Sequence, residues 1–397
     1  MNTHLRTALF TLPLLLNTGC FGDLTDLSEI SWDIPSSDFS PAPRVYFDED
    51  ATIETIAGSG DAGTSFSTSY GYEDLCSNTG SQSGDGGPAT EAHLNWPTGI
   101  AVDANGALLI ADQCNDVIRS VSPEGIITTQ VSVGHVGPLS FKLEGPGGVE
   151  VSAYGNRYVV DTFSHTVLRI GNDGVARVIV GMPNQQGSVE LTSPAPQLAP
   201  VLSYPTGVAE DGSGRLYIAN YWGSDILKVE KGRIERLDVN VSYAGGIATD
   251  REGNLYITDN LHHQVLKRDA HGSYSVLAGS GVMGSQGDGG PAVEAQLHYP
   301  SGVRVRDDGV VFVTDAYNHR VVAITPDGIL YTVVGNGALI DDVYYEIGRF
   351  GGDGASLDEI SLNQPYALDF DAEGNLLIAD AMNNRIRKVR FSPAEAL

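Results

Sequence analysis

Residues 94–131 read LNWPTGIAVDANGALLIADQCNDVIRSVSPEGIITTQV and decide the fold. They hold four apolar runs, each as long as a strand and too short for a stable helix. The runs are 99–102, 108–111, 117–121 and 126–131. Hairpin turns separate them at 103–106 and 122–125, where Asn and Gly tolerate positive φ and Pro presets φ. This stretch therefore predicts one four-stranded antiparallel sheet.

The same unit recurs along the chain, which is typical of a repeat architecture. Further copies begin at Leu143, Leu202, Ser242, Leu297 and Leu362. The last copy stops before its fourth strand, whereas residues 51–60, ATIETIAGSG, match a fourth strand and follow no first three. We therefore predict an all-β fold for residues 51–397, a six-bladed β-propeller of four-stranded antiparallel blades. The N-terminal strand completes the last blade and closes the ring.

The first 50 residues lack this repeat. Residues 1–19 have a basic start and a short apolar run at 7–16, which predicts a secretory signal peptide. Cys20 follows Thr-Gly, as in a bacterial lipoprotein processing site, so we expect it to be lipidated; an ordinary cleaved signal is the alternative. Residues 20–50 are acidic and Pro-rich and predict a disordered tether. The expected location is the cell envelope, with the propeller anchored through lipid.

The charge limits the possible partners. The formal net charge is −27, and cleavage before Cys20 removes Arg6, leaving 22 basic and 50 acidic residues, or −28. Proteins that bind phosphates use Lys and Arg, so this balance argues against nucleic acid. A protein, peptide or glycan ligand remains open, and we expect a monomeric propeller.

Cys76 and Cys114 are the remaining cysteines, and a pair in an exported protein favours a disulfide. The first strand of each blade enters from one end of the propeller, here called the top face. Cys114 lies in the loop between the second and third strands of the first blade, and Cys76 lies in the connector that leads into that blade. Both segments belong to the top face, so we predict a bond between Cys76 and Cys114.

The repeat resembles the NHL-repeat β-propellers over residues 51–397. The matching motifs are the PTGIAVD start, the ANGALLIAD hairpin and the D-x-x-N-H-R-V segment at 315–321. Three connectors, at 84–94, 287–297 and 351–362, are similar to those of bacterial extracytoplasmic NHL proteins. The resemblance implies the fold more strongly than a function, because NHL proteins include receptor-kinase sensors, RNA-binding domains, adhesion-type proteins and a metal-dependent peptide-amidating lyase.

Long connectors are expected to converge on the top face, where a ligand would bind. Aromatic side chains recur at the start of the first strand: Trp96, Tyr204, Tyr243 and Tyr299, with Gly145 and Gln364 in the other two blades. Together with Trp222 and Tyr317 in the adjoining loops, they are the candidate ligand-binding residues. Aromatic rings stack on sugars and cationic groups. Packing between blades is the alternative, and repetition in several blades favours it.

Three histidines occupy equivalent loop positions: His165, His263 and His319. Converging imidazoles would make a zinc site with an open position for water, as in the amidating lyase. Equivalent residues of different blades are spread around the ring, however, so ordinary turn histidines are the favoured interpretation. A zinc- or calcium-dependent lyase or hydrolase remains the alternative function.

Acidic residues form two further sets. The second strand of each blade ends in Asp112, Asp161, Asn220, Asp259, Asp315 or Asp380. Recurrence favours capping of the following loop over a ring of metal ligands, because acidic groups facing one axis would repel one another. The GDGG-type connectors contribute Asp85, Asp288 and Asp353, for which an Asx-turn is favoured over calcium binding. Basic residues on the third strands are expected on the exposed face: Arg119, Arg169, Lys228, Lys267 and Arg387.

No nucleophile elbow, phosphate loop or paired-cysteine metal motif occurs in the sequence. We therefore expect a non-catalytic propeller, without a cofactor, that binds a ligand or protein through its aromatic top face.

Overall fold

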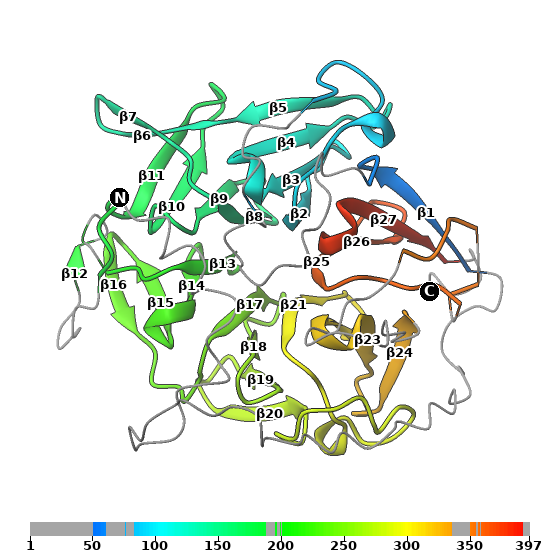
Figure 1. The fold of residues 1–397 in the computed structure, drawn as a ribbon. Helices are drawn as coiled ribbons and strands as arrows, with labels where there is room; N and C mark the ends of the chain where they lie inside the picture. Colours follow the sequence, from blue (N-terminus) through cyan, green and yellow to red (C-terminus); the bar gives the residue numbers. More distant parts are fainter. Residues whose placement is uncertain are drawn as a thin grey trace, which may run out of the picture.

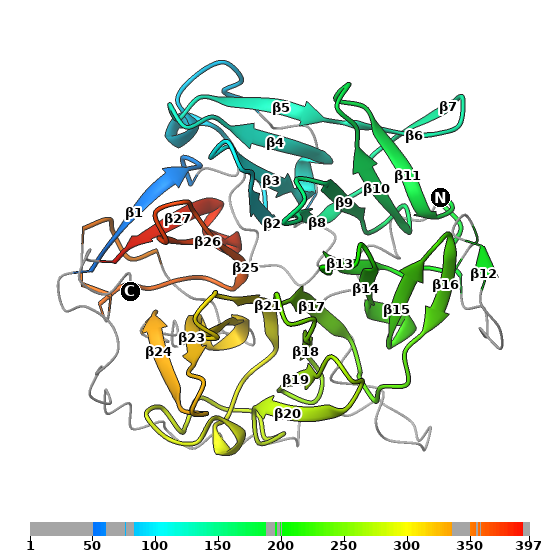
Figure 2. The same ribbon diagram turned by 180° about the vertical axis from the view of Figure 1, so that it is seen from behind.

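The computed structural model describes residues 51–60, 76, 83–187, 195–196, 199, 201–335, 350–354, 356–357 and 359–391. Six sheets surround a central axis, and the innermost strand of each lies beside it (Figure 1; Figure 2 shows the opposite side). The predicted six-bladed propeller is confirmed. The signal peptide, the tether and the proposed lipidation at Cys20 lie outside the described residues.

The strands follow the repeats read from the sequence. The first blade holds β2 (Pro97–Val102), β3 (Leu108–Asp112), β4 (Val117–Val121) and β5 (Ile127–Val131), and the second holds β8 (Pro146–Val151), β9 (Arg157–Asp161), β10 (Thr166–Ile170) and β11 (Ala176–Gly181). The third blade holds β13 (Pro205–Glu210), β14 (Leu216–Asn220), β15 (Asp225–Glu230) and β16 (Arg233–Arg236), and the fourth holds β17 (Ala244–Thr249), β18 (Leu255–Asp259), β19 (Gln264–Arg268) and β20 (Tyr274–Ala278). The fifth blade holds β21 (Pro300–Val305), β22 (Val311–Asp315), β23 (Arg320–Ile324) and β24 (Leu330–Val334), and the sixth holds β25 (Pro365–Phe370), β26 (Leu376–Asp380), β27 (Arg385–Arg390) and β1 (Thr52–Ala57). Apolar cores fill the spaces between neighbouring blades.

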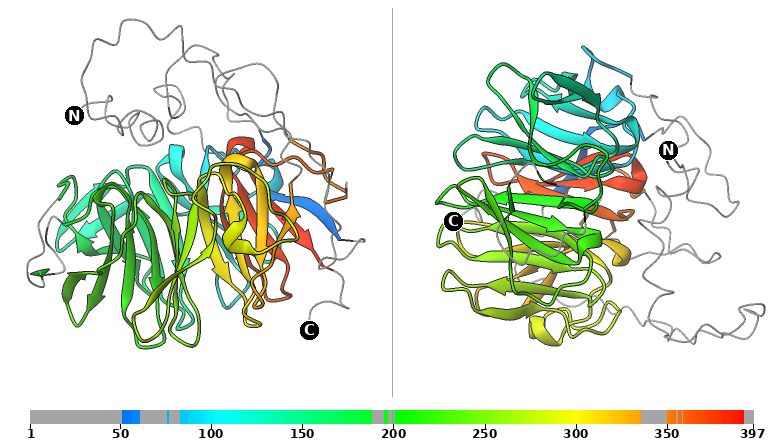
Figure 3. Two further views of the ribbon diagram at one scale, coloured as in Figure 1. Left: turned by 90° about the horizontal axis from the view of Figure 1, so that it is seen from below. Right: turned by 90° about the vertical axis from the view of Figure 1, so that its left-hand side faces the viewer.

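The N-terminal strand closes the ring as predicted. β1 pairs antiparallel with β27, with Thr52 opposite Arg390 and Ile53 opposite Val389. Figure 3 shows the blue strand beside the red strands of the sixth blade. Ile53 is 1 % exposed and joins the core between the fifth and sixth blades. The closure therefore covers the edge of β27 and also contributes apolar burial.

Glycine in the inner strands allows neighbouring blades to approach closely. A Cβ on Gly99 would lie 2.7 Å from Cα of Gly148 in the next blade, and one on Gly246 would lie 2.3 Å from the backbone oxygen of Ser301. Real Cβ atoms do not reach these distances, so the third residue of the PTG motif is fixed by contact between blades.

The described parts of the connectors lie mainly along the outer edges of the blades, whereas Cys76, in the first connector, lies at the top of the first blade beside Trp96. Gly86 N–H donates to Ile127 C=O on β5, and Gly289 N–H donates to Leu330 C=O on β24. β6 (Val133–Val136) pairs with β11, and β12 (Ala195–Pro196) pairs with β16. Outer strands carry unpaired backbone groups, and these segments satisfy them.

Two of the third-strand basic residues are buried, so their predicted exposure is wrong. Arg119 and Arg387 are both 0 % exposed, whereas Arg169 is exposed. The two buried arginines stand seven residues after Asp112 and Asp380, and Arg169 stands eight after Asp161. Because side chains alternate between the faces of a strand, this offset of one residue reverses the direction of the side chain.

Each buried arginine joins a connector to its blade. Arg119 contacts Asp85 at 2.7 Å and Asp112 at 3.5 Å. Arg387 contacts Asp353 at 2.9 Å and Asp380 at 3.4 Å. Asp85 and Asp353 thus reach beyond a local Asx-turn and each neutralises a buried guanidinium. In the part of the chain that the structure describes, no helix is long and apolar enough to cross a membrane.

Candidate functional site

The top face is built from a turn that recurs in the blades. After β3, the chain forms a 3-10 turn, η6 (Gln113–Asn115), which ends at Asp116 with φ of 56°. The Asp112 carboxylate accepts the N–H of Asn95 at 2.7 Å and the side-chain amide of Asn115 at 2.9 Å. The second bond is the predicted cap within the loop, and the first bond links the turn to the start of the blade.

The first of these bonds occurs in every blade, always to the residue 17 positions earlier. The acceptors are Asp112, Asp161, Asn220, Asp259, Asp315 and Asp380. Burial raises the pKa of Asp112 and Asp380 to about 6, and hydrogen bonds and the arginines limit this rise.

The three candidate histidines end the turns of different blades. His165, His263 and His319 have φ between 52° and 56°. Each accepts, through Nδ1, the backbone N–H at the start of the next inner strand, at Tyr204, Tyr299 and Gln364 respectively. Burial lowers the pKa of His165 and His263 to about 4, with neighbouring histidines adding to the effect at His263. These imidazoles are therefore neutral acceptors that join adjacent blades.

The histidines are not brought together. Across residues 51–60, 76, 83–187, 201–335 and the other described positions, no group of three or more His, Cys, Asp or Glu side chains is arranged to hold a metal ion. His263 does contact His298, with ring centroids 5.7 Å apart, but that pair belongs to the aromatic cluster described next.

The candidate aromatic residues divide into a buried set and a partly exposed set. Trp96, Tyr204 and Tyr299 are 5 %, 5 % and 8 % exposed, as expected for packing between blades. Tyr243, Trp222 and Tyr317 are of intermediate exposure. Trp222 packs on Tyr204 with centroids 5.3 Å apart, and Tyr317 packs on Tyr299 at 5.0 Å. The buried rings thus support partly exposed ones.

Tyr221 connects these groups across the top of the channel, and sequence reasoning missed it. Its hydroxyl lies 2.7 Å from that of Tyr299, two blades away, and its ring lies 5.0 Å from Tyr243. Tyr221 is 5 % exposed, and burial raises the pKa of its hydroxyl well above the usual value. The available sequence signal was the recurrence of this position directly after the second strand, and Gln113 and Asn260, at the same position in other blades, also line the channel.

The axial channel runs below this tyrosine pair. It encloses about 890 Å³ of empty space, including its open ends, and all six inner strands line it. Its wall combines glycine backbone and aliphatic residues with hydroxyl and amide side chains, among them Thr98, Thr206 and Ser301.

A charged cluster crosses the lower part of the channel. Arg304 on β21 contacts Glu150 on β8 at 2.6 Å and Asp369 on β25 at 3.4 Å. Glu150 keeps 17 % side-chain exposure. Burial raises its pKa to about 7 against the attraction of Arg304, and Asp369 and Glu210 raise it further. The three charges join the second, fifth and sixth blades.

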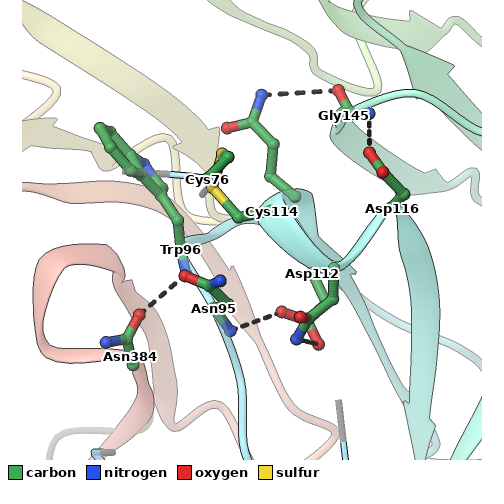
Figure 4. The surroundings of a disulfide bond; sticks show 10 residues. Cys76, Asn95, Trp96, Asp112, Cys114, Asp116, Gly145 and Asn384 are labelled. Atoms are coloured by element: carbon green, nitrogen blue, oxygen red, sulfur yellow. Dashed lines mark hydrogen bonds between the residues drawn. A yellow bond between two sulfur atoms is a disulfide. The ribbon is translucent and has the colours of Figure 1, made fainter. Parts of the chain in front are cut away.

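The predicted disulfide joins Cys76 and Cys114, whose Cα atoms are 4.8 Å apart. It lies beside Trp96 at the top of the first blade (Figure 4). Trp96 N–H donates to Asn384 of the sixth blade at 2.8 Å. The bond therefore holds the connector against the junction where the ring closes.

Comparison with known proteins fits this architecture. The family model for the teneurin NHL domain matches residues 54–231 and 247–343. The chain belongs to the teneurin NHL-domain family. Mouse Teneurin-1 is 26 % identical over 367 residues, which cover 85 % of this chain and 12 % of that protein. Zebrafish Teneurin-3 is 30 % identical over 259 residues, or 61 % of this chain and 8 % of that protein. This NHL domain thus spans about a tenth of the length of the teneurins it matches.

Solved structures share the fold of this NHL domain. An auxiliary nutrient binding protein from Bacteroides thetaiotaomicron superposes with a TM-score of 0.62 at 15 % identity, covering 87 % of this chain and 77 % of that one. A protein of unknown function from the same organism gives 0.61 at 18 % identity, covering 86 % and 76 %. At these identities the likeness establishes the propeller alone.

Proposed function

We propose that this NHL propeller is a non-catalytic binding protein of the cell envelope and that its aromatic top face contacts a protein, peptide or glycan. One observation carries the proposal: aromatic side chains from the second to the fifth blade form a continuous cluster over the channel mouth. Trp222, Tyr243 and Tyr317 remain partly exposed within it.

The chemistry of this surface favours flat or cationic groups. Aromatic faces attract sugar rings and ammonium groups, and the net charge of −27 attracts cations. The same charge disfavours nucleic acid. The auxiliary nutrient binding protein from Bacteroides thetaiotaomicron shares this fold, which is consistent with a binding function.

The proposal is tested by isothermal titration calorimetry of neutral oligosaccharides and of a trimethyllysine peptide with the purified protein. Trp222→Ala and Tyr317→Ala are expected to weaken binding about tenfold, because each removes a stacking surface. Tyr154→Ala is the matched control, since Tyr154 is 59 % exposed in the turn between β8 and β9, at the opposite end of the blade. Unchanged binding by both top-face variants would refute the assignment.

Metal content separates this function from the alternative lyase or hydrolase. Equimolar zinc in the purified protein, lost in His165→Ala or His263→Ala, would favour the enzyme. Envelope anchoring has its own test: Cys20→Ser is expected to move the exported protein from the membrane fraction to the soluble fraction. An unchanged membrane fraction would contradict lipidation at Cys20.

A further inference from the structure

The fourth strand of each blade has an outer edge, and among the described residues five of the six edges are paired by another segment of this chain. β6 pairs with β11, β12 with β16, and GDGG-type connectors with β5, β24 and β1. The paired residues occupy equivalent positions on the fourth strands. Each lies opposite the third-strand residue that follows the last residue of the second strand by nine positions. They are Ile127, Ala176, Ile234, Leu330 and Ile53.

The first and fifth blades show which backbone groups face outward. In the fifth blade, Leu330 N–H donates to Gly290 C=O, Leu330 C=O accepts from Gly289 N–H, and Gly328 C=O accepts from Ala292 N–H. Thr332 N–H donates to the carboxylate of Asp288. Ile127 and Gly125 make the same backbone bonds in the first blade. An extended connector thus continues each sheet outward.

β20 of the fourth blade has the same outward-facing backbone N–H and C=O groups, but no described connector pairs with them. Its register places Tyr274 opposite Arg268 and Val276 opposite Leu266, so Tyr274 corresponds to Leu330 and Val276 to Thr332. Among the described residues, no backbone segment bonds to the outer side of Tyr274 or Val276. The reason lies in the chain: only residues 237–243 link the third and fourth blades, too few to form a covering strand. β20 lies at the rim of the propeller (Figure 1).

The side chains of this edge indicate an apolar partner. At the register of Val276, three covered blades carry Thr129, Thr332 and Thr55, each bonded to the Asp of a connector. The second blade carries Val178, which is 8 % exposed and belongs to a core cluster. Val136 and Phe141 complete this cluster from the hairpin of β6 and β7 (Leu139–Lys142). Val276 is 39 % exposed. The fourth blade therefore resembles the second blade with its hairpin removed.

Charge supports the same conclusion. Residues 272–287 contain no Asp, Glu, Lys or Arg in a chain of net charge −27. Exposed edge strands are commonly protected from pairing by charged side chains, and this edge has none. Val282 and Met283, in the connector that follows β20, are 55 % and 56 % exposed. An uncharged strand with apolar side chains would therefore meet no charged side chain from residues 272–287.

We propose that β20 is a docking edge at which an extended, uncharged segment of another protein adds as a fifth strand of the fourth blade. Main-chain bonds to Gly272, Tyr274 and Val276 would supply affinity, and an apolar side chain covering Val276 would supply selectivity. This surface is on the rim and is independent of the aromatic top face.

The test uses a phage-displayed library of random ten-residue peptides selected on the full chain. Val276→Pro removes the outward N–H, and proline is tolerated where an edge N–H faces solvent. Val276→Thr keeps that N–H and copies Thr332 of the fifth blade, so it is the matched control. We expect uncharged, alternately apolar peptides whose affinity for Val276→Pro is about tenfold lower and whose affinity for Val276→Thr is within about threefold of the unsubstituted chain.

Hydrogen exchange supplies a second measurement that needs no peptide. The amides of Tyr274 and Val276 are expected to exchange faster than those of Leu330 and Thr332, and to slow when a selected peptide is bound. Slow exchange of Tyr274 and Val276 in the free protein, failure to select any peptide, or equal binding to Val276→Pro would each overturn the proposal. A dimer that Val276→Pro dissociates would instead identify a second copy as the occupant. Loss of top-face binding leaves this result unaffected, because Trp222 and Tyr317 lie on another surface.

Discussion

Replacing Arg387 with leucine should destabilise the propeller at the point where its ring closes. The guanidinium is fully buried and contacts Asp380, Asp353 and the carbonyl of Gly351. Arg387→Leu leaves Asp380, itself 0 % exposed, without its cation. Breaking a buried ion pair from one side costs about 3–5 kcal/mol. An unfolding entropy of about 2.1 cal/mol/K per residue over roughly 340 residues then gives a decrease in Tm of about 6 °C.

The dependence on pH gives this prediction a definite sign. Burial already raises the pKa of Asp380 to about 6, and losing Arg387 raises it further. A carboxyl whose pKa is higher in the folded state favours folding when it is protonated, so stability is lost as pH rises through the folded-state pKa. The cost of Arg387→Leu should therefore be smaller at pH 5 than at pH 8 in urea titrations followed by circular dichroism.

Arg169→Leu is the matched control, because Arg169 is exposed on the third strand of the second blade. Arg169→Leu is expected to change the free energy of unfolding by less than about 0.5 kcal/mol. If both substitutions cost the same, or if Arg387→Leu costs less than about 1 kcal/mol at pH 8, the ion pair does not hold the connector to the closing sheet.

The remaining predictions concern other bonds of the ring. Reducing the Cys76–Cys114 bond should lower the free energy of unfolding by about 4 kcal/mol, because it opens a loop with a sequence separation of 38; urea titration with and without reductant measures this change, and an unchanged midpoint contradicts it. Burial raises the pKa of Glu150 to about 7, so its ionisation makes stability fall as pH rises from about 4.5 to 7. Glu150→Gln removes this ionisation and should make Tm vary less with pH. Parallel profiles of Tm against pH for the two proteins would argue against this. Gly246→Ala should cost about 1–3 kcal/mol through overlap with Ser301, whereas Gly352→Ala, with open space around it, should not; equal thermal shifts would show that the blades adjust.

Strand positions and closure could be predicted from the sequence because both depend on local pattern. Each blade has turn residues at fixed offsets, and a β-strand pattern at 51–57 without a partner in sequence requires a partner in space. The disulfide followed from the same topology, since it placed Cys76 and Cys114 in segments at the top of one blade.

Other features depend on side-chain direction and on contacts between blades, which the pattern does not specify. A shift of one residue separates buried Arg387 from exposed Arg169, and their chemistry is the same. The β6–β7 hairpin and β12 have weak strand signals and exist because an outer edge is available for pairing. Tyr221 was missed because its partner Tyr299 is 78 residues away in the chain.

The left-handed backbone at the start of the inner strands has a consequence for how such a surface can vary. Trp96, Tyr204, Tyr243, Tyr299, Gln364 and Gly145 all adopt φ between 46° and 58°. In most blades a side chain from the preceding or following turn fixes that conformation through the backbone N–H, whatever residue stands there. These six positions share one backbone conformation and can therefore hold different residues, at a strain of about 1 kcal/mol for each residue other than glycine. Because Trp96, Tyr204 and Tyr299 are buried, exchanging residues at these positions changes the rings that support Trp222 and Tyr317 while the backbone beneath keeps its conformation.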